Sequence, residues 1–178
     1  CALPISAGAA LAAELRRRGV HELPNLIALG LARGGVVVAA QAAQELHIPL
    51  DVMVVRKLGL PFQPEVAMGA LAPGVQILDA AMIAEFNVSA ADVQNVIAHE
   101  SAELQRREAL YHRGRSPLAL QDQTVLLVDD GLATGMTTLA AVRAARRAQP
   151  RQIIVAAPVG SREACRRLQR EEPGVRCI

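Results

Sequence analysis

The chain has 178 residues, of which 52% are hydrophobic and 2% aromatic, and its 19 basic and 17 acidic residues give a net charge of +2. This length fits one domain of ordinary size with an aliphatic core. The charge balance and the scarcity of aromatic rings argue against a nucleic-acid binder, which usually carries a basic patch or rings on which bases stack. There is no apolar run long enough for a membrane helix, and residues 1–8 lack the pattern of a signal peptide.

The three cysteines are Cys1, Cys165 and Cys177. An odd number with no closely spaced pair gives no disulfide framework and no zinc-binding spacing. The cysteines therefore favour a reducing, intracellular setting, and we expect a cytoplasmic protein in which Cys165 is simply a packed helix residue.

In the first half of the chain, short apolar runs alternate with helical periodicity. The pattern predicts a helix over 5–19, a buried strand over 25–31, a turn at Gly34-Gly35, a helix over 36–47 and a second strand over 50–56. Residues 58–66 contain one glycine and two prolines and are expected to form a mobile loop. Segments 67–71 and 75–78 flank Pro73-Gly74 and predict a hairpin.

The second half predicts a long helix followed by alternating strands and helices. Ser89 and Asp92 form a capping pattern at the start of a helix over 89–112. Its charges at helical spacing predict an exposed, ion-paired face, and a role in substrate recognition is the weaker alternative. Then follow a strand over 124–129, a helix over 137–148, a strand over 152–157, a helix over 161–169 and a last strand over 175–178.

This order of elements predicts an α/β fold, a parallel twisted sheet with helices on both faces and an inserted β-hairpin and loop after the second strand. Ligands in such folds bind beyond the carboxyl ends of the strands. The residues that follow Leu31, Arg56 and Val128 are therefore the candidates for a site.

The segment over 125–138, VLLVDDGLATGMTT, carries the strongest signal. An apolar strand runs into Asp129 and Asp130, and a glycine-rich turn with threonine hydroxyls then opens a helix. The N–H groups of such a turn and helix end form an anion site. Met136 stands where a nucleoside-triphosphate loop needs a lysine. Two carboxylates would normally repel a nearby phosphate, unless a polyol lies between the carboxylates and the phosphate and donates its hydroxyls to the carboxylates. A ribose 5-phosphate has that shape.

This run resembles the signature of type I phosphoribosyltransferases, which bind phosphoribosyl pyrophosphate (PRPP). The shared features are the apolar strand, the acidic pair and a small-residue loop closing with Thr-Gly-x-Thr. The resemblance implies that Asp129 and Asp130 hold the ribose 2- and 3-hydroxyls. It also implies a 5-phosphate loop made of Gly131, Leu132, Ala133, Thr134, Gly135, Met136 and Thr137. An acidic turn without a ligand is the weaker alternative.

Two other strand ends carry cations. Taken alone, Arg33-Gly34-Gly35 is as compatible with an ordinary turn as with a site, and Arg56-Lys57 could be salt-bridged surface residues. The resemblance implies that both segments bind pyrophosphate, the first as a loop that often has a strained peptide bond. It also implies a hood loop over 58–66, which here lacks a basic residue and a Ser-Tyr pair. Glu65, its charged residue, binds metal or faces water.

The resemblance implies a transferase of nucleotide metabolism, a glycosyltransferase that binds PRPP and Mg²⁺. It would pass the phosphoribosyl group to a nucleobase-like acceptor and release pyrophosphate. Asp129, Asp130, Arg56 and Lys57 would be the catalytic residues, with no direct metal ligand assigned. One alternative is a non-catalytic regulatory protein of the same fold that senses PRPP or a nucleotide. A sugar-phosphate hydrolase is the weakest, because no nucleophile is evident.

The resemblance covers 27–158 and is strongest to a broad bacterial branch with the patterns RGG, V-R-K and V-D-D-G-x-A-T-G. We expect one phosphoribosyltransferase-like domain over 1–178, with termini open to extension because the chain starts at Cys1 and ends inside an expected strand. The expected partners are PRPP and a small-molecule acceptor, without nucleic acid or membrane. The acceptor, the general base and the oligomeric state stay open, a homodimer included.

Overall fold

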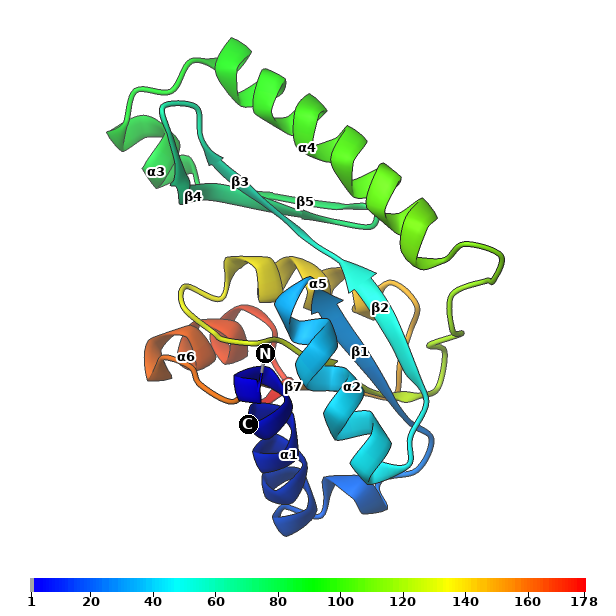
Figure 1. The fold of residues 1–178 in the computed structure, drawn as a ribbon. Helices are drawn as coiled ribbons and strands as arrows, with labels where there is room; N and C mark the ends of the chain where they lie inside the picture. The colour runs from blue at the N-terminus through cyan, green and yellow to red at the C-terminus, as the bar shows by residue number, and fades with distance from the viewer. Residues whose placement is uncertain (1) are drawn as a thin grey trace.

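The structure, a computed structural model, describes residues 2–178, with side chains from residue 5 onward, and Cys1 lies outside the described residues. Two sheets form the framework (Figure 1). The parallel sheet has the order β2-β1-β6-β7-β8 and consists of β1 (Leu26–Ala32), β2 (Leu50–Val54), β6 (Thr124–Val128), β7 (Gln152–Ala156) and β8 (Arg176–Cys177). The antiparallel sheet has the order β3-β4-β5 and consists of β3 (Arg56–Leu60), β4 (Gln63–Ala72) and β5 (Val75–Leu78).

Helices cover both faces of the parallel sheet, as the sequence predicted. On one face, α1 (Ala2–Arg17) and α2 (Gly34–Leu46) pack on Leu126 and Val128 of β6. On the other face, α5 (Met136–Arg146) and α6 (Arg162–Glu171) pack on Val125 and Leu127. A short 3₁₀ helix, η1 (Val20–Glu22), precedes β1. Within residues 2–178, none of the helices combines the length and apolarity that crossing a membrane requires.

The antiparallel sheet and two helices form a separate layer, which we call the hood (residues 56–111). It contains α3 (Ala80–Glu85) and α4 (Ala90–Tyr111). The face of its sheet that carries Leu58 and Met68 packs on α4, and the face that carries Ala70 packs on α5. The hood therefore stands over the edge of the parallel sheet at which the strands end, with α4 on its outer side (Figure 1).

Part of the hood was predicted wrongly. The second strand ends at Val54, and residues 58–66 are two paired strand ends with a tight turn instead of a loop. Leu58 and Leu60 are buried at period two, which is strand spacing. The pairing shifts register on both sides of Gly59, where a Cβ would collide with the backbone of Pro64. The glycine and prolines that suggested a loop are thus accommodated by an irregular hairpin.

The remaining elements match the prediction within a few residues. The hairpin at Pro73-Gly74 and the long helix are confirmed, and Ser89 caps α4 by accepting the N–H of Asp92 at 3.1 Å. Helix α2 begins at Gly34, so the two glycines form its first turn and not a turn before it. Helix α3 was not predicted, and Asp79 caps it with bonds to two backbone N–H groups.

The chain returns from the hood through a buried contact on β2. Asp51, 2% exposed, accepts hydrogen bonds from Arg115 at 2.6 Å and from the N–H of Leu118 at 2.8 Å. Burial opposes its charge, but these bonds and the N–H of Val52 outweigh it and lower the pKa of Asp51. His112 Nε2 lies 3.5 Å from the same carboxylate. The carboxylate therefore fixes the exit of α4 to the parallel sheet.

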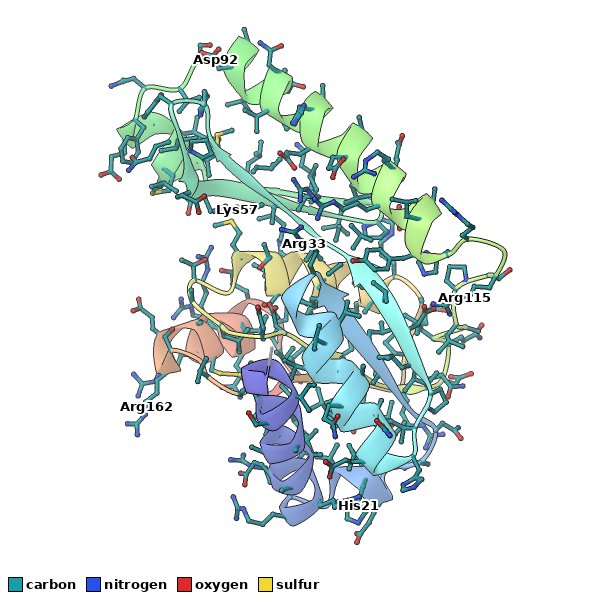
Figure 2. All side chains as sticks on the ribbon, in the orientation of Figure 1. His21, Arg33, Lys57, Asp92, Arg115 and Arg162 are labelled. Atoms are coloured by element: carbon teal, nitrogen blue, oxygen red, sulfur yellow. A yellow bond between two sulfur atoms is a disulfide. The ribbon has the colours of Figure 1, made fainter. Side chains whose placement is uncertain are left out.

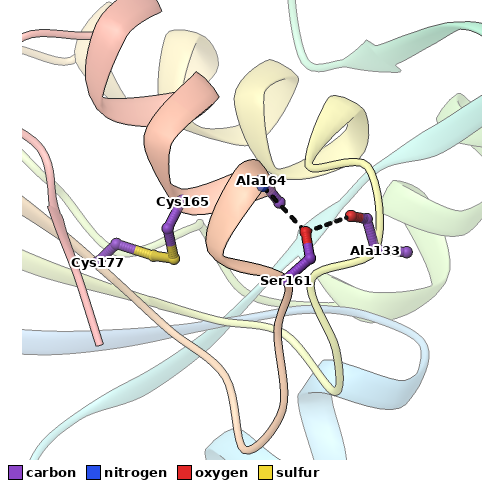
Figure 3. The surroundings of a disulfide bond; sticks show 5 residues. All are labelled: Ala133, Ser161, Ala164, Cys165 and Cys177. Carbon is purple, nitrogen blue, oxygen red and sulfur yellow. Dashed lines mark hydrogen bonds between the residues drawn. A yellow bond between two sulfur atoms is a disulfide. The ribbon is translucent and has the colours of Figure 1, made fainter.

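The interpretation of the cysteines was wrong. Cys165 of α6 and Cys177 of β8 form a disulfide, with their Cα atoms 5.9 Å apart (Figure 3). The chain reverses between α6 and β8, which brings together two residues separated by 12 positions. Sequence spacing did not reveal that reversal. The cysteines consequently give no argument for a reducing compartment.

Reduction of this disulfide should lower the free energy of unfolding by about 3 kcal/mol, the chain-entropy value for a loop of this size. Urea unfolding with and without a dithiol reductant measures the difference. The double variant C165A/C177A is the control, and it should show the reduced stability and no response to the reductant. Equal stability of the oxidised and reduced wild-type protein would contradict the expectation.

Candidate functional site

The loops after β1 and β6 lie against each other because these strands are direct neighbours, with Gly30 in register with Val128. A Cβ on Gly34 would run into the carboxylate of Asp130. A Cβ on Gly35 would lie 2.5 Å from the carbonyl oxygen of Val128. The first turn of α2 therefore contacts the acidic pair only because both positions are glycine.

Arg33 precedes these glycines. The peptide bond between Ala32 and Arg33 is cis. The side chain of Arg33 is exposed and forms no ion pair with any of residues 2–178. Figure 2 shows Arg33 at the end of the parallel sheet, on the side that faces the hood. A free guanidinium at this position can donate to an anionic ligand.

The two carboxylates of the acidic pair have different surroundings. Asp129 is half-buried, and its carboxylate accepts the N–H of Asp130 at 2.9 Å and the hydroxyl of Thr138 at 3.3 Å. Burial raises the pKa of Asp129 to about 6, with the neighbouring Asp130 carboxylate adding to the rise and the two hydrogen bonds opposing it. Asp130 is exposed. The pair thus offers one oriented carboxylate and one open to a ligand.

The loop that follows is fixed at one residue and open at the others. Leu132 is buried, its N–H donates to the carbonyl of Val159 at 3.0 Å, and its carbonyl accepts the N–H of Ser161 at 2.9 Å. Gly135 precedes α5 with φ 74° and provides no side-chain cap. Within residues 2–178, no acceptor is found for the N–H groups of Ala133, Thr134, Gly135, Met136 and Thr137. Such free donors at a helix N-terminus form an anion-binding pocket.

A cavity of about 420 Å³ separates this loop from the hood. The hood contributes Lys57, Glu65, Val66, Ala67, Asp79 and Met82 to its lining, the loop contributes Gly131 and residues 133–138, and α6 contributes Arg167. Lys57 Nζ lies 3.1 Å from the carboxylate of Glu65, and the Glu65 side chain is 95% exposed. The cavity therefore has donors on the loop side and a cation on the hood side.

Arg56 faces another way. Its guanidinium donates to Glu100 of α4, with Nε and Nη2 each 2.6 Å from Oε2. It borders a separate groove of about 620 Å³ between the β3–β4 hairpin and α4. Side chains alternate along a strand, and of the two neighbouring cations only Lys57 also borders the cavity at the phosphate loop.

The structure thus brings together the two glycines, the acidic pair and the loop, with Arg33 directly before the glycines and Lys57 across the cavity from the loop. Arg56 lies apart. Arg167 also borders the cavity, although it was not among the residues predicted for the site. It lies far along the chain from the acidic pair, on a helix with several other arginines. No local sequence pattern distinguishes it from those neighbouring arginines.

Loops at the carboxyl ends of a parallel sheet, with an acidic pair and free backbone donors, are typical of α/β proteins that bind phosphorylated ligands. The family model of the phosphoribosyl transferase domain matches residues 5–178, and the chain belongs to this family. The predicted family is therefore confirmed.

Two Mycobacterium tuberculosis proteins, from strains CDC 1551 and H37Rv, are provisionally named phosphoribosyl transferases. Each is 43% identical to the chain over 136 residues, which are 76% of this chain and 31% of the relative. The chain thus spans less than a third of the length of these relatives.

Solved structures confirm the fold. The protein TT1426 from Thermus thermophilus is 38% identical, with a TM-score of 0.72 over 98% of this chain and 81% of that one. The adenine phosphoribosyl transferase of Trypanosoma brucei, solved with AMP, pyrophosphate and ribose-5-phosphate, shares the fold at 14% identity. Its TM-score is 0.50 over 90% of this chain and 62% of that one.

The two glycines should respond differently to alanine. Gly35→Ala should lower the free energy of unfolding by about 1–3 kcal/mol, because its Cβ would meet the backbone of Val128. Gly34→Ala should lower the free energy of unfolding by less, because the Asp130 side chain can turn away from the added Cβ. Urea unfolding of both variants compares them. A larger loss of stability in Gly34→Ala than in Gly35→Ala would contradict this packing of the two glycines.

Asp129→Asn should stabilise the protein at neutral pH. The pKa of Asp129 is about 6 in the folded state against 3.8 for the ordinary group, so folding favours its protonated form. Wild-type stability therefore falls as the pH rises through this window, by at most about 3 kcal/mol from this group. The variant avoids that loss, so its advantage should be present at about pH 7.5 and vanish near pH 4.

Urea unfolding of the wild type and the variant at both pH values measures this difference. Asp122→Asn is the matched control, because Asp122 is an exposed carboxylate remote from the loop. An Asp129→Asn variant that tracks the wild type at both pH values would contradict the expectation.

Proposed function

We propose that the chain binds PRPP with Mg²⁺ and transfers the phosphoribosyl group to a nucleobase-like acceptor, releasing pyrophosphate. The observation that carries the proposal is the acidic pair directly beside a row of unpaired N–H donors. Carboxylates accept hydrogen bonds from sugar hydroxyls, and N–H groups donate to a phosphate ester. A ribose 5-phosphate can use both at once. In this proposal Asp129 and Asp130 hold the ribose, and the loop over 131–137 holds its phosphate.

The cations at the site favour a diphosphate leaving group. Arg33 is exposed and directly precedes Gly34, which contacts Asp130, and Lys57 borders the cavity from the hood. Positive charge that is already in place stabilises the charge that develops on the leaving group. Arg56 can join them only if it exchanges Glu100 for the diphosphate. The Trypanosoma brucei enzyme, whose structure holds pyrophosphate and ribose-5-phosphate, supports this class of ligand.

The donor set fits Mg²⁺ that is shared with the substrate. Proteins hold this ion through one or two carboxylates together with substrate phosphates. No group of three or more His, Cys, Asp or Glu side chains that could form a cage occurs in the part of the chain that the structure describes. The exposed carboxylate of Asp130 beside the loop is the candidate ligand. When bound, Mg²⁺ would neutralise charge on the diphosphate.

A second candidate is a protein that senses PRPP or a nucleotide without transferring the group. Lys57 is the one cation that the hood contributes to the cavity lining, and it is paired with Glu65. A hood with so little free positive charge gives weak support to pyrophosphate departure. A cytoplasmic location, where nucleotide precursors are used, belongs to either form of the proposal.

Asp129→Asn combined with Asp130→Asn should abolish PRPP binding, because the double variant loses both charged acceptors for the ribose hydroxyls. Calorimetric titration with PRPP and Mg²⁺ measures this, with Asp122→Asn as control. Unchanged affinity in the folded double variant would overturn the ribose assignment. The wild-type protein should also release pyrophosphate when PRPP is offered with a panel of nucleobases. Saturable PRPP binding without turnover would favour the sensor.

A further inference from the structure

Helix α6 is fixed against the phosphate loop at its first turn. The Ser161 hydroxyl caps the helix by accepting the N–H of Ala164 at 3.0 Å and also donates to the carbonyl of Ala133 at 3.0 Å (Figure 3). A Cβ on Gly135 would lie 3.4 Å from the Cβ of Ala164. One face of α6 therefore touches two residues of the loop.

Arg167 lies three positions after Ala164, which places it on this same face, one turn farther along. It borders the cavity of about 420 Å³ together with the loop residues. It also borders a smaller cavity of about 230 Å³, together with Ala133, Thr134, Ser161, Glu163 and Ala164. Arg167 consequently stands at the rim of the phosphate loop.

The guanidinium of Arg167 is held in one orientation by a neighbour, but part of its hydrogen-bonding capacity is unused. Its Nε donates to Glu171 Oε1 at 2.8 Å, and the side chain is 31% exposed. Neither terminal nitrogen has a hydrogen-bond partner among residues 2–178. Glu171 lies one turn beyond, so it fixes the guanidinium plane while the two terminal nitrogens remain available to a ligand.

The helix that carries Arg167 is also held from behind. Leu168, 2% exposed, packs into the core. Cys165 ties α6 to Cys177 of β8 (Figure 3). Positioning the backbone in advance reduces the entropy that a ligand must remove when it binds. An arginine on such a helix is better placed for recognition than one on a free loop.

The loop itself lacks positive charge. Residues 131–137 supply N–H groups and threonine hydroxyls but neither lysine nor arginine. A monoester phosphate carries a charge of about −1.5 to −2 at neutral pH. An arginine fork matches the geometry of phosphate oxygens and supplies the missing charge. We infer that Arg167 binds the 5-phosphate of the ribose and selects its dianionic form. This inference rests on the proposed function.

The test compares Arg167→Gln with Arg166→Gln, an exposed arginine one position away on the same helix. The probe is ribose 5-phosphate, titrated calorimetrically at several pH values. Arg167→Gln should weaken its affinity about 10- to 100-fold, the loss of a charged hydrogen bond, and Arg166→Gln should not change it. Wild-type affinity should rise near pH 6, where both the phosphate and the ribose-binding Asp129 lose a proton. The Arg167→Gln profile should be flatter, because this variant keeps the contribution of Asp129 and loses the preference of Arg167 for the dianion.

Glu171→Gln separates direct binding from a structural role. It removes the ion pair but keeps the arginine, so affinity should hold if Arg167 contacts the phosphate. Equal losses in Glu171→Gln and Arg167→Gln would overturn the inference. If Arg167→Gln binds ribose 5-phosphate as tightly as the wild-type protein does, the inference is also wrong, whereas the proposed function is unaffected. If the wild-type protein binds neither ribose 5-phosphate nor PRPP with Mg²⁺, both the inference and the proposed function are wrong.

Discussion

The site depends on the close approach of two backbones, the first turn of α2 and the end of β6. Gly34 and Gly35 have no side chains to separate them, so the carboxylate of Asp130 and the carbonyl of Val128 lie where a Cβ would otherwise be. The parallel pairing of β1 with β6 sets the level at which they meet. The glycine motif and the acidic motif are therefore one physical unit, although almost a hundred positions separate them in sequence.

This close packing carries an energetic cost at Asp129. A half-buried carboxylate beside a second one has a pKa raised to about 6, which means that its charged form is disfavoured where it lies. Groups of this kind are concentrated at functional sites, where a ligand supplies the interactions that the protein alone does not. The N–H groups at the start of α5 are donors without acceptors, and they favour an anion. A ligand that donates to carboxylates and accepts from amides satisfies both.

The sequence predicted the parts of the fold that follow from local pattern. The apolar run of β6 ends in two acids and a glycine turn, and a parallel sheet brings such strand ends to one edge. The hairpin around Gly59 could not be predicted, because only its pairing partner shows why glycine and proline are tolerated there. The Cys165–Cys177 pair and the position of Arg167 depend on how α6 packs and on the chain reversal after it. No local pattern specifies that packing.

The two sides of the cavity are anchored independently. The hood leaves β2 through Val55 and returns to the same strand through the contacts of Asp51 with Arg115 and Leu118. The phosphate loop is instead held by β6 and α6. Two cations border the cavity, Lys57 on the hood and Arg167 on α6, so they lie on the two separately anchored sides. A ligand with negative charge at two separated groups would bridge both anchors, and PRPP, with a phosphate at one end and a diphosphate at the other, has that distribution of charge.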